Sequence, residues 1–510
     1  MIAADDPLHR KRVVSHMVLL MMCFSCLFVL SAQRINVSIT IVHMVNWTAL
    51  DETSECRPLS FDSNCTVYTD NEPGKLAWSH LIQSQVLASY FYGLALGHWS
   101  SECLAAYLKV KWMALFGTLV ASTCNFLTPL AATNNVYILI GLQFTKALGQ
   151  AIVIPSFGML VDAWVGSDSM AGFMGYCATA LPLGAFITIL VSGMICDSDN
   201  YGWEYVFYIS GSIGIIWCLL WSYLASEYFY PTVLIYNTRE DPVYNPERPR
   251  APLRFMFTSK AVWAFLLCSL TTYWAWSFNL LLLPLYARRV FQAPMQWNYM
   301  ASSAPNLLQA FLFLVAVMSS EQLVSNGILN AGPVRIFLMV IGFLVFATCN
   351  VLLTFAKCSR GYAALLNFLA YGFIGLNLAA TSALPSDLSP NYGGVISATV
   401  NTVGPLFGSL LPLAVAFLPD TKEGIGNWNY IFYASALIGF VAMIIFIMIG
   451  PRKMEPWNDH QRSDLMELAR NGFSDLVDRG HSSEININEK ETPSEENSAS
   501  ASAVTDSKKG

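Results

Sequence analysis

The chain alternates between long apolar stretches and short polar connections. Each apolar stretch has about 20 residues or more, the length that an α-helix needs to cross roughly 30 Å of hydrocarbon. Twelve such stretches predict an all-α membrane protein with 12 transmembrane helices. The predicted spans are 14–45, 79–103, 111–131, 136–164, 171–195, 205–226, 260–286, 300–320, 334–356, 361–386, 392–417 and 429–450.

An even number of spans places both termini on the same side of the membrane. The first span follows the cluster Arg10, Lys11 and Arg12, and basic residues favour the cytosolic side. We therefore predict cytosolic termini. The predicted parts are a cytosolic N-terminus (1–13), an N-terminal six-helix half (14–226), a cytosolic linker (227–259), a C-terminal six-helix half (260–450) and a cytosolic tail (451–510).

The loop between the first two spans, residues 46–78, is the one sizeable polar loop predicted on the opposite side. It holds two patterns for N-glycosylation, at Asn46 and Asn64. Asn46 is close to the bilayer, so Asn64 is the better candidate. Cys56 and Cys65 lie in the same loop and could form a disulfide in an oxidising compartment. These features predict a lumenal or extracellular loop that is glycosylated.

The chain contains an internal repeat. The segment Trp203-Glu-Tyr-Val-Phe-Tyr-Ile-Ser210 shares five residues, at one offset of 225, with Trp428-Asn-Tyr-Ile-Phe-Tyr-Ala-Ser435. The two segments begin the sixth and the twelfth spans. Two six-helix halves joined by a polar linker are typical of the major-facilitator fold, in which the halves rock around a central site. The alternative is a chance likeness between two aromatic belts at the membrane surface.

Composition excludes several classes of function. Hydrophobic residues make up 55% of the chain and charged residues only 12%, which is far from a soluble domain. Residues 456–510 hold 11 acidic and 6 basic side chains and so account for five of the six net negative charges. The nearly neutral body has no basic surface for nucleic acid. We expect the tail to be a disordered solvated linker or a binding segment for cytosolic proteins.

Ionisable and amide groups inside membrane helices are costly and mark solute pathways. Arg34 lies deep in the first span, and Gln143, Lys146 and Gln150 share one face of the fourth because they are spaced i, i+3, i+7. The other polar stripes are Gln85, Ser89 and Tyr92 in the second span, Thr272, Trp276 and Asn279 in the seventh, and Ser397 and Asn401 in the eleventh. Together they predict a cation-containing cavity for a small anion.

Each of these residues also has a purely structural interpretation. Arg34 could neutralise a helix C-terminus or a lipid headgroup, and Lys146 could reach the membrane surface. The uncharged side chains could serve only as hydrogen bonds between helices.

A set of short segments resembles the anion/cation symporter family of the major facilitators, which includes the vesicular glutamate transporters, sialin and the type I sodium-phosphate cotransporters. Each segment alone is weak, but together they extend over residues 14–459. They are Arg34-Ile-Asn-Val-Ser38, Ser89-Tyr-Phe-Tyr-Gly93, Gly202-Trp-Glu-Tyr-Val-Phe-Tyr208, Phe257-Thr-Ser259, Asp387-Leu-Ser-Pro-Asn-Tyr392, Asn401-Thr402, Trp428-Asn-Tyr-Ile-Phe432 and Pro456-Trp457. The resemblance implies a divergent member that transports an anion by symport.

The departures from the family pattern bear on coupling. The family's fourth helix carries an arginine and, seven residues later, a glutamate implicated in proton coupling. With Pro155 as the reference, these positions hold Gln143 and Gln150, and Lys146 is the remaining cation. The arginine that the glutamate transporters have in the seventh helix corresponds to Thr272. Glutamine does not titrate, so the proton coupling of the family is not expected at this position.

The leading hypothesis is a secondary transporter of a small organic or inorganic anion that works by alternating access. The alternative is a non-transporting membrane receptor or chaperone derived from the same family. We expect no enzymatic activity, no metal site and no cofactor, apart from a coupling ion such as Na⁺ or H⁺. The predicted substrate contacts are Arg34, Lys146, Gln143, Gln150, Tyr92, Thr272, Asn279 and Asn401. The protein is expected in the plasma membrane or in a vesicular or lysosomal membrane.

Overall fold

The computed structural model describes residues 7–46, 76–105, 107–165, 167–198, 201–227, 253–417 and 424–458. Regular structure in these ranges is helical, apart from one β-bridge between Val45 and Leu76. The first helices are α1 (Pro7–Met44), α2 (His80–Ala105), α3 (Val110–Asn134), α4 (Val136–Val165), α5 (Ser167–Ala178), α6 (Ala180–Cys196) and α7 (Glu204–Glu227). They are followed by α9 (Leu253–Thr258), α10 (Lys260–Ser277), η2 (Phe278–Leu282), α11 (Leu283–Phe291), α12 (Met295–Ser325), α13 (Ala331–Leu353), α14 (Arg360–Gly372), α15 (Ile374–Leu388), α16 (Gly393–Ala416), α17 (Gly424–Ile449) and η3 (Pro456–Asn458).

The helices agree with the spans expected from hydropathy. Eleven helical stretches in the described ranges are long and apolar enough to cross a membrane. The one remaining predicted span, 79–103, is α2, which has 26 residues but falls short in hydropathy. Its polar side chains Gln83, Ser84 and Ser89 are buried inside the protein, so the helix does not expose them to lipid.

Several helices extend beyond their predicted ends. The span predicted at 300–320 is α12, which reaches from Met295 to Ser325, and the one predicted at 260–286 continues to Phe291. Hydropathy finds only the part that lies in hydrocarbon. The backbone keeps its helical hydrogen bonds further out, because polar side chains at helix ends are stable in the headgroup region.

The seventh span contains a wide helical turn. The main-chain N–H of Leu283 donates to the carbonyl of Phe278, five residues earlier, which is the π-helical pattern of η2. The next residue is Pro284, which has no N–H to donate and whose ring clashes with the carbonyl four residues back. The wide turn avoids this clash and places Asn279, Leu280 and Leu281 in the protein interior.

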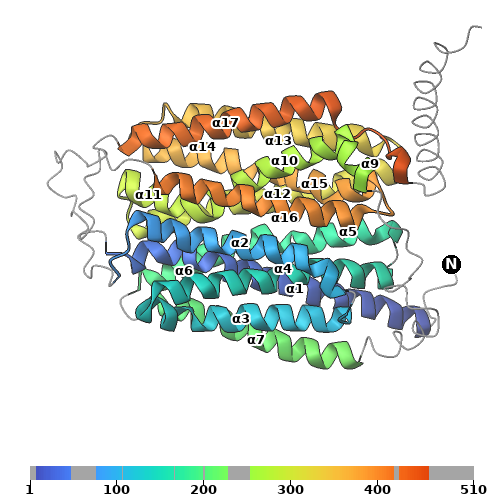
Figure 1. Cartoon of the computed structure of the whole chain (residues 1–510), viewed down its shortest axis with the longest axis horizontal. Coiled ribbons are helices and arrows are strands. Elements are labelled where there is room, and N and C mark those ends of the chain that lie inside the picture. The colour runs from blue at the N-terminus through green and yellow to red at the C-terminus, as the bar shows by residue number, and fades with distance from the viewer. Residues whose placement is uncertain are drawn as a thin grey trace, which may run out of the picture. The chain divides into compact units, whose positions relative to one another are not determined.

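We call α1–α7 the first half and α10–α17 the second half. In Figure 1 the blue-to-green helices of the first half lie below the yellow-to-red helices of the second. The halves meet where α2 packs on α16 and α6 packs on α12, and α1 contacts η2 and α11. A site between α1, α2 and η2 therefore lies on the boundary of the two halves.

Close helix contacts depend on glycine. A Cβ added to Gly404 on α16 would lie 2.2 Å from the Tyr273 ring of α10, and one added to Gly408 would lie 3.3 Å from the Phe91 ring of α2. The pair Gly404-x-x-x-Gly408 therefore lets two aromatic side chains reach the backbone of α16. The motif therefore serves close packing of α16 against its neighbours.

The segment that follows α17 folds back on the turn between α15 and α16. The Asn458 side-chain oxygen accepts hydrogen bonds from Ser389 Oγ at 2.6 Å and from the Asn391 N–H at 3.1 Å. The Trp457 ring is 4% exposed and its centroid lies 6.2 Å from that of Tyr392. Two of the short family-like segments, 387–392 and 456–457, are therefore structural partners of each other.

Candidate substrate site at the boundary of the two halves

Arg34 occupies the centre of the boundary, on α1. Its side chain is 7% exposed, and its Nε donates a hydrogen bond to the Tyr90 hydroxyl at 2.7 Å. The guanidinium carbon lies 4.4 Å from the ring centroid of Trp276 and 5.6 Å from that of Tyr90. The cation therefore contacts α2 of its own half and an aromatic ring of the opposite half.

A chain of hydrogen bonds fixes Arg34 to the fourth span. The Tyr90 hydroxyl donates to Gln150 Oε1 at 2.6 Å, and Gln150 Nε2 donates to the Leu30 carbonyl at 3.2 Å. Arg34, Tyr90 and Gln150 are all buried. Because each member holds the next, the guanidinium has a fixed position before any solute arrives.

Lys146 is completely buried on α4. Its ammonium donates to the Gln33 carbonyl at 2.9 Å and lies 5.9 Å from the centroid of the Tyr90 ring. Lys146 is not among the residues that line the cavity described next. Lys146 thus adds positive charge near Arg34 without a direct contact to the cavity.

A small cavity lies against Arg34 on the boundary. The first half contributes Arg34, Tyr90 and Phe91, and the second half contributes Trp276, Leu280 and Leu281. The Phe91 and Trp276 rings meet edge to face, with their centroids 6.5 Å apart. One cation and five aromatic or aliphatic side chains therefore make up the walls.

Neither buried cation has a carboxylate partner within the described ranges. The ion pair found there joins Arg335 Nε and Asp387 Oδ2 at 2.8 Å, between α13 and α15 in the second half. A buried charge without a counterion is strongly unfavourable in a membrane protein. The arrangement favours an anion beside Arg34, because its charge would compensate that of the guanidinium.

The two halves also touch on both sides of the cavity. At the start of α2, Gln83 Oε1 accepts from Arg289 Nη2 of α11 at 3.0 Å, and His80 contacts the same guanidinium. Near the C-terminal end of α12, the Tyr176 hydroxyl of α5 donates to Glu321 Oε2 at 3.3 Å. Polar contacts between the halves therefore occur towards both ends of the bundle.

Other predicted contacts lie away from the cavity. Tyr92 is 39% exposed on the outer side of α2, while its neighbour Tyr90 makes the contact with Arg34. The Thr272 hydroxyl donates to the Cys268 carbonyl at 3.0 Å. Asn279 Nδ2 donates to Asn306 Oδ1 at 3.0 Å inside the second half.

Asn401 and Gln143 do not line the cavity either. Asn401 Oδ1 accepts a hydrogen bond from the Tyr273 hydroxyl at 3.1 Å, and the Tyr273 ring packs against that of Trp276. Gln143 is 2% exposed on α4, and its Nε2 has no hydrogen-bond partner among the described residues. Asn401 therefore supports the wall residue Trp276 indirectly.

The predictions for the loop between the first two spans fall largely outside the described residues. Asn64, Cys56 and Cys65 lie there, and Asn46 is at its edge, where its N–H donates to the Leu76 carbonyl at 2.9 Å. Cys358, between α13 and α14, is disulfide-bonded. No pattern in the sequence predicts this bond.

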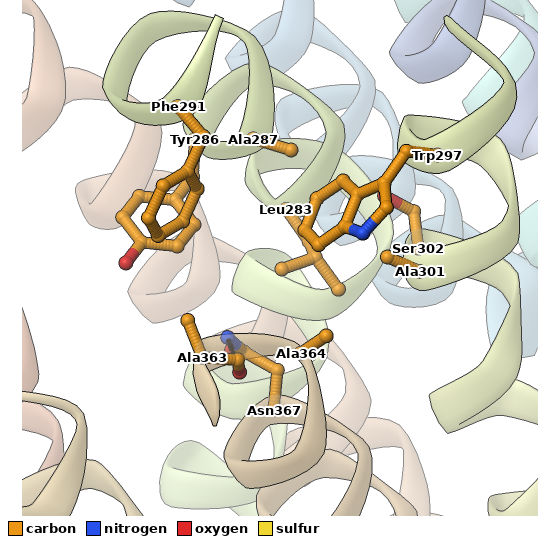
Figure 2. Close-up of a pocket in the computed structure, with 10 residues that line it drawn as sticks. All are labelled: Leu283, Tyr286, Ala287, Phe291, Trp297, Ala301, Ser302, Ala363, Ala364 and Asn367. Carbon is orange, nitrogen blue, oxygen red and sulfur yellow. Dashed lines mark hydrogen bonds between the residues drawn. The ribbon is translucent and has the colours of Figure 1, made fainter. Parts of the chain in front are cut away.

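A second cavity lies wholly within the second half, between α11, α12 and α14. Figure 2 shows the rings of Tyr286, Phe291 and Trp297 around it, with Asn367 facing them. Its walls contain no charged side chain. Asn367 is 2% exposed, and its Nδ2 donates to the Ala363 carbonyl at 2.8 Å. This cavity offers nothing to balance an anionic charge.

Comparison with known proteins decides the family. Residues 17–412 match the model of the Major Facilitator Superfamily. The chain belongs to the Major Facilitator Superfamily. This is a family of transporters rather than enzymes, and the predicted fold of 12 transmembrane helices in two six-helix halves is confirmed. The xylose transporter XylE of E. coli, in a partially occluded inward-open conformation, has a TM-score of 0.61 at 10% identity, covering 86% of this chain and 98% of that one.

Individual relatives agree with the resemblance read from the short segments. Human sialin is 25% identical over 456 residues, which is 87% of this chain and 91% of sialin. The mouse probable small intestine urate exporter is 25% identical over 85% of this chain and 90% of its own length. Bovine vesicular glutamate transporter 2 is 24% identical over 84% of this chain and 73% of its own. The protein is a divergent, multi-pass member of this group.

Proposed function

We propose that this protein is a secondary active transporter of a small anion. The observation that carries the proposal is Arg34, a buried guanidinium without a carboxylate partner in the described ranges, on the boundary between the two halves. Two of the relatives are named for the anions urate and glutamate, which supports an anionic solute. We assign Arg34 as the principal contact, Lys146 as a second source of positive potential, and Tyr90 and Gln150 as residues that position Arg34.

The mechanism we propose is alternating access. The site is shared between the halves, so a rocking movement would expose Arg34 first to one side and then to the other. The contacts of Arg289 with Gln83 and of Tyr176 with Glu321 lie at opposite ends of the bundle, and each would break in one open state. Both are polar contacts between halves, which suits contacts that must form and break repeatedly.

We propose that transport needs no cofactor and uses an ion gradient or the membrane potential. The position that carries a glutamate in the family is Gln150, whose amide is engaged with Tyr90 and Leu30. An amide cannot carry a proton, so this position does not supply proton coupling. Uptake driven separately by a Na⁺ gradient, a pH gradient and a potential identifies the coupling ion.

The orientation follows from the distribution of basic residues in the sequence. We propose cytosolic termini, glycosylation at Asn64, and a plasma-membrane or vesicular location, with the tail available to cytosolic proteins. Glycosidase sensitivity that disappears in Asn64→Gln tests the orientation. Peptide mapping without reduction identifies the partner of Cys358 and tests the proposed Cys56–Cys65 pair.

The test of function is uptake into proteoliposomes. Purified protein is supplied with labelled phosphate, glutamate, aspartate, sialate or urate under an imposed potential, as wild type and as Arg34→Ala. We expect saturable uptake of at least one anion in the wild type and none in Arg34→Ala. The matched control is Arg335→Ala, which removes an arginine of similar burial away from the boundary.

A folded protein that takes up no anion would contradict the transporter and favour the non-transporting receptor or chaperone. Folding is followed by size-exclusion profile and melting temperature, so that loss of uptake is not confused with loss of structure. A current that rises without saturation would instead indicate a channel.

A further inference from the structure

Cys358 of the second half, in the turn between α13 and α14, takes part in a disulfide. Eight other cysteines in the described ranges have free thiols. The chain has 12 cysteines, so the candidates for the other end of the bond are Cys56, Cys65 and Cys103. Their positions along the chain decide between them.

The surroundings of Cys358 fix the end of the bundle at which it lies. Two residues further along the chain, Arg360 Nη2 donates to the carbonyl of Phe291, the last residue of α11, at 2.8 Å. Arg289, in the last turn of the same helix, contacts His80, the first residue of α2. Cys358 therefore lies at the end of the bundle where α2 begins.

Cys103 lies near the opposite end of α2. An α-helix rises about 1.5 Å per residue, so the Cα atoms of His80 and Cys103 are about 35 Å apart. The two Cα atoms of a disulfide are usually only about 4.4–6.8 Å apart. The length of α2 therefore excludes Cys103 as the partner of Cys358, and the two cysteines of the loop between α1 and α2 remain.

Both remaining cysteines can reach the end of the bundle where Cys358 lies. The base of their loop is held there, because Val45 and Leu76 form a β-bridge and the Asn46 N–H donates to the Leu76 carbonyl at 2.9 Å. About ten residues separate this base from either cysteine, and an extended chain covers about 3.3 Å per residue. A reach of about 30 Å is enough to cross from one helix of the bundle to another.

We infer that a disulfide joins Cys358 to Cys56 or Cys65 and thereby links the two halves covalently. In forming the bond, the two thiols give up two electrons and two protons to a disulfide oxidant, which is reduced to two thiols. This pairing and the pair Cys56–Cys65 exclude each other, since each cysteine forms a single bond. The inference does not depend on the proposed function.

The bond also bears on the orientation of the protein. Disulfides form and persist in oxidising compartments and are rare in the cytosol. The end of the bundle that holds Cys358 and the start of α2 is then lumenal or extracellular. This argument is independent of the distribution of basic residues.

The test cuts the chain between the two halves. A recognition site for a specific protease is inserted into the linker, 227–259, of the full-length protein. Free thiols are blocked with N-ethylmaleimide before the cut, so that no disulfide forms or exchanges afterwards. On a denaturing gel we expect one band of the uncut mass without reductant and two fragments after reduction.

Substitutions identify the bonded pair. Cys358→Ser and the double variant Cys56→Ser/Cys65→Ser should each give two fragments without reductant, and the single variants show which loop cysteine is used. Cys196→Ser is the matched control, because Cys196 has a free thiol at the end of α6. It should give the single band of the wild type.

Three outcomes would overturn the inference. Two fragments from the wild type without reductant would show that no disulfide joins the halves, and this result does not depend on how the variants fold. A link that persists in the double variant would assign the bond to another cysteine. A band of twice the uncut mass that disappears in Cys358→Ser would place the bond between two copies of the chain. None of these outcomes bears on uptake, so they leave the proposed transporter intact.

Discussion

The two cavities described above both have aromatic side chains in their walls, but only one has a charged side chain there. The cavity at Arg34 lies on the boundary of the halves and has a cation in its wall, whereas the cavity at Asn367 lies inside the second half and has none. A cavity inside one half keeps its walls when the halves rock. The proposed rocking movement would open only the boundary cavity to either side, so position and charge together make it the candidate site.

The largest expected effect comes from removing the charge. Arg34→Ala leaves an anion without its partner, and loss of a buried charge contact of this kind costs about 2–5 kcal/mol, enough to take uptake below detection. Arg34→Lys keeps the charge but loses the planar fork, so we expect weak residual uptake. Initial rates over a range of solute concentrations check both.

Asn367→Ala provides the comparison in the other cavity. It should change uptake less than about twofold, because Asn367 lies inside one half and loss of its hydrogen bond is worth only about 0.5–1.5 kcal/mol of folding free energy. Equal loss of uptake in Arg34→Ala and Asn367→Ala would remove the distinction between the two cavities.

The second effect concerns the close contact of α16 with aromatic side chains at the boundary. Gly404→Ala introduces a Cβ 2.2 Å from the Tyr273 ring, which supports Trp276. We expect a loss of about 1–3 kcal/mol of stability and a clear fall in uptake. Gly361→Ala, on α14 with no atom within 4 Å of the added Cβ, is the matched control. Melting temperature and uptake are measured on both.

The third effect tests the link between Arg34 and the fourth span. Gln150→Glu places a titratable group next to Tyr90, which contacts Arg34. The carboxylate would offset the positive charge that attracts the anion, so uptake should fall at neutral pH. It should recover as acidification neutralises the carboxylate. Wild-type uptake should lack this recovery, and uptake measured against pH at constant potential checks the difference.

The smallest effect is expected from the amide of the second cavity. Asn367 Oδ1 is buried without a hydrogen-bond partner among the described residues. Replacing the amide with a similar apolar shape in Asn367→Leu removes an unsatisfied group, so stability should stay the same or rise by less than about 1 kcal/mol. A large drop in melting temperature would show that the oxygen is bonded in the protein.

The sequence predicted the spans well because hydropathy over 20 residues is a strong signal. It predicted the individual faces of helices less well. In α2 the stripe of Gln85, Ser89 and Tyr92 was chosen as the inner face, but Gln85 and Tyr92 face outward and Tyr90 faces Arg34. A span that is apolar all round carries little periodicity, so the orientation of its faces is set by packing.

The cations were visible in the sequence and the cavity walls were not. Arg34 and Lys146 stood out because charges are rare in membrane spans. Leu280 and Leu281 look in the sequence like any residue that faces lipid, and it is the π-helical turn before Pro284 that places them at the boundary. The contact of Lys146 with a main-chain carbonyl leaves no trace in the sequence either.

The folded-back segment after α17 determines where the chain can be shortened. Cutting at the end of the last helix, Ile449, would strip Trp457 and Asn458 from the turn between α15 and α16 and expose the backbone groups that they satisfy. A protein that ends just after Asn458 keeps these contacts and discards the acidic tail. A fluorescent label joined after Asn458 would be attached to residues that are held against the second half. Its position would therefore follow the movement of that half.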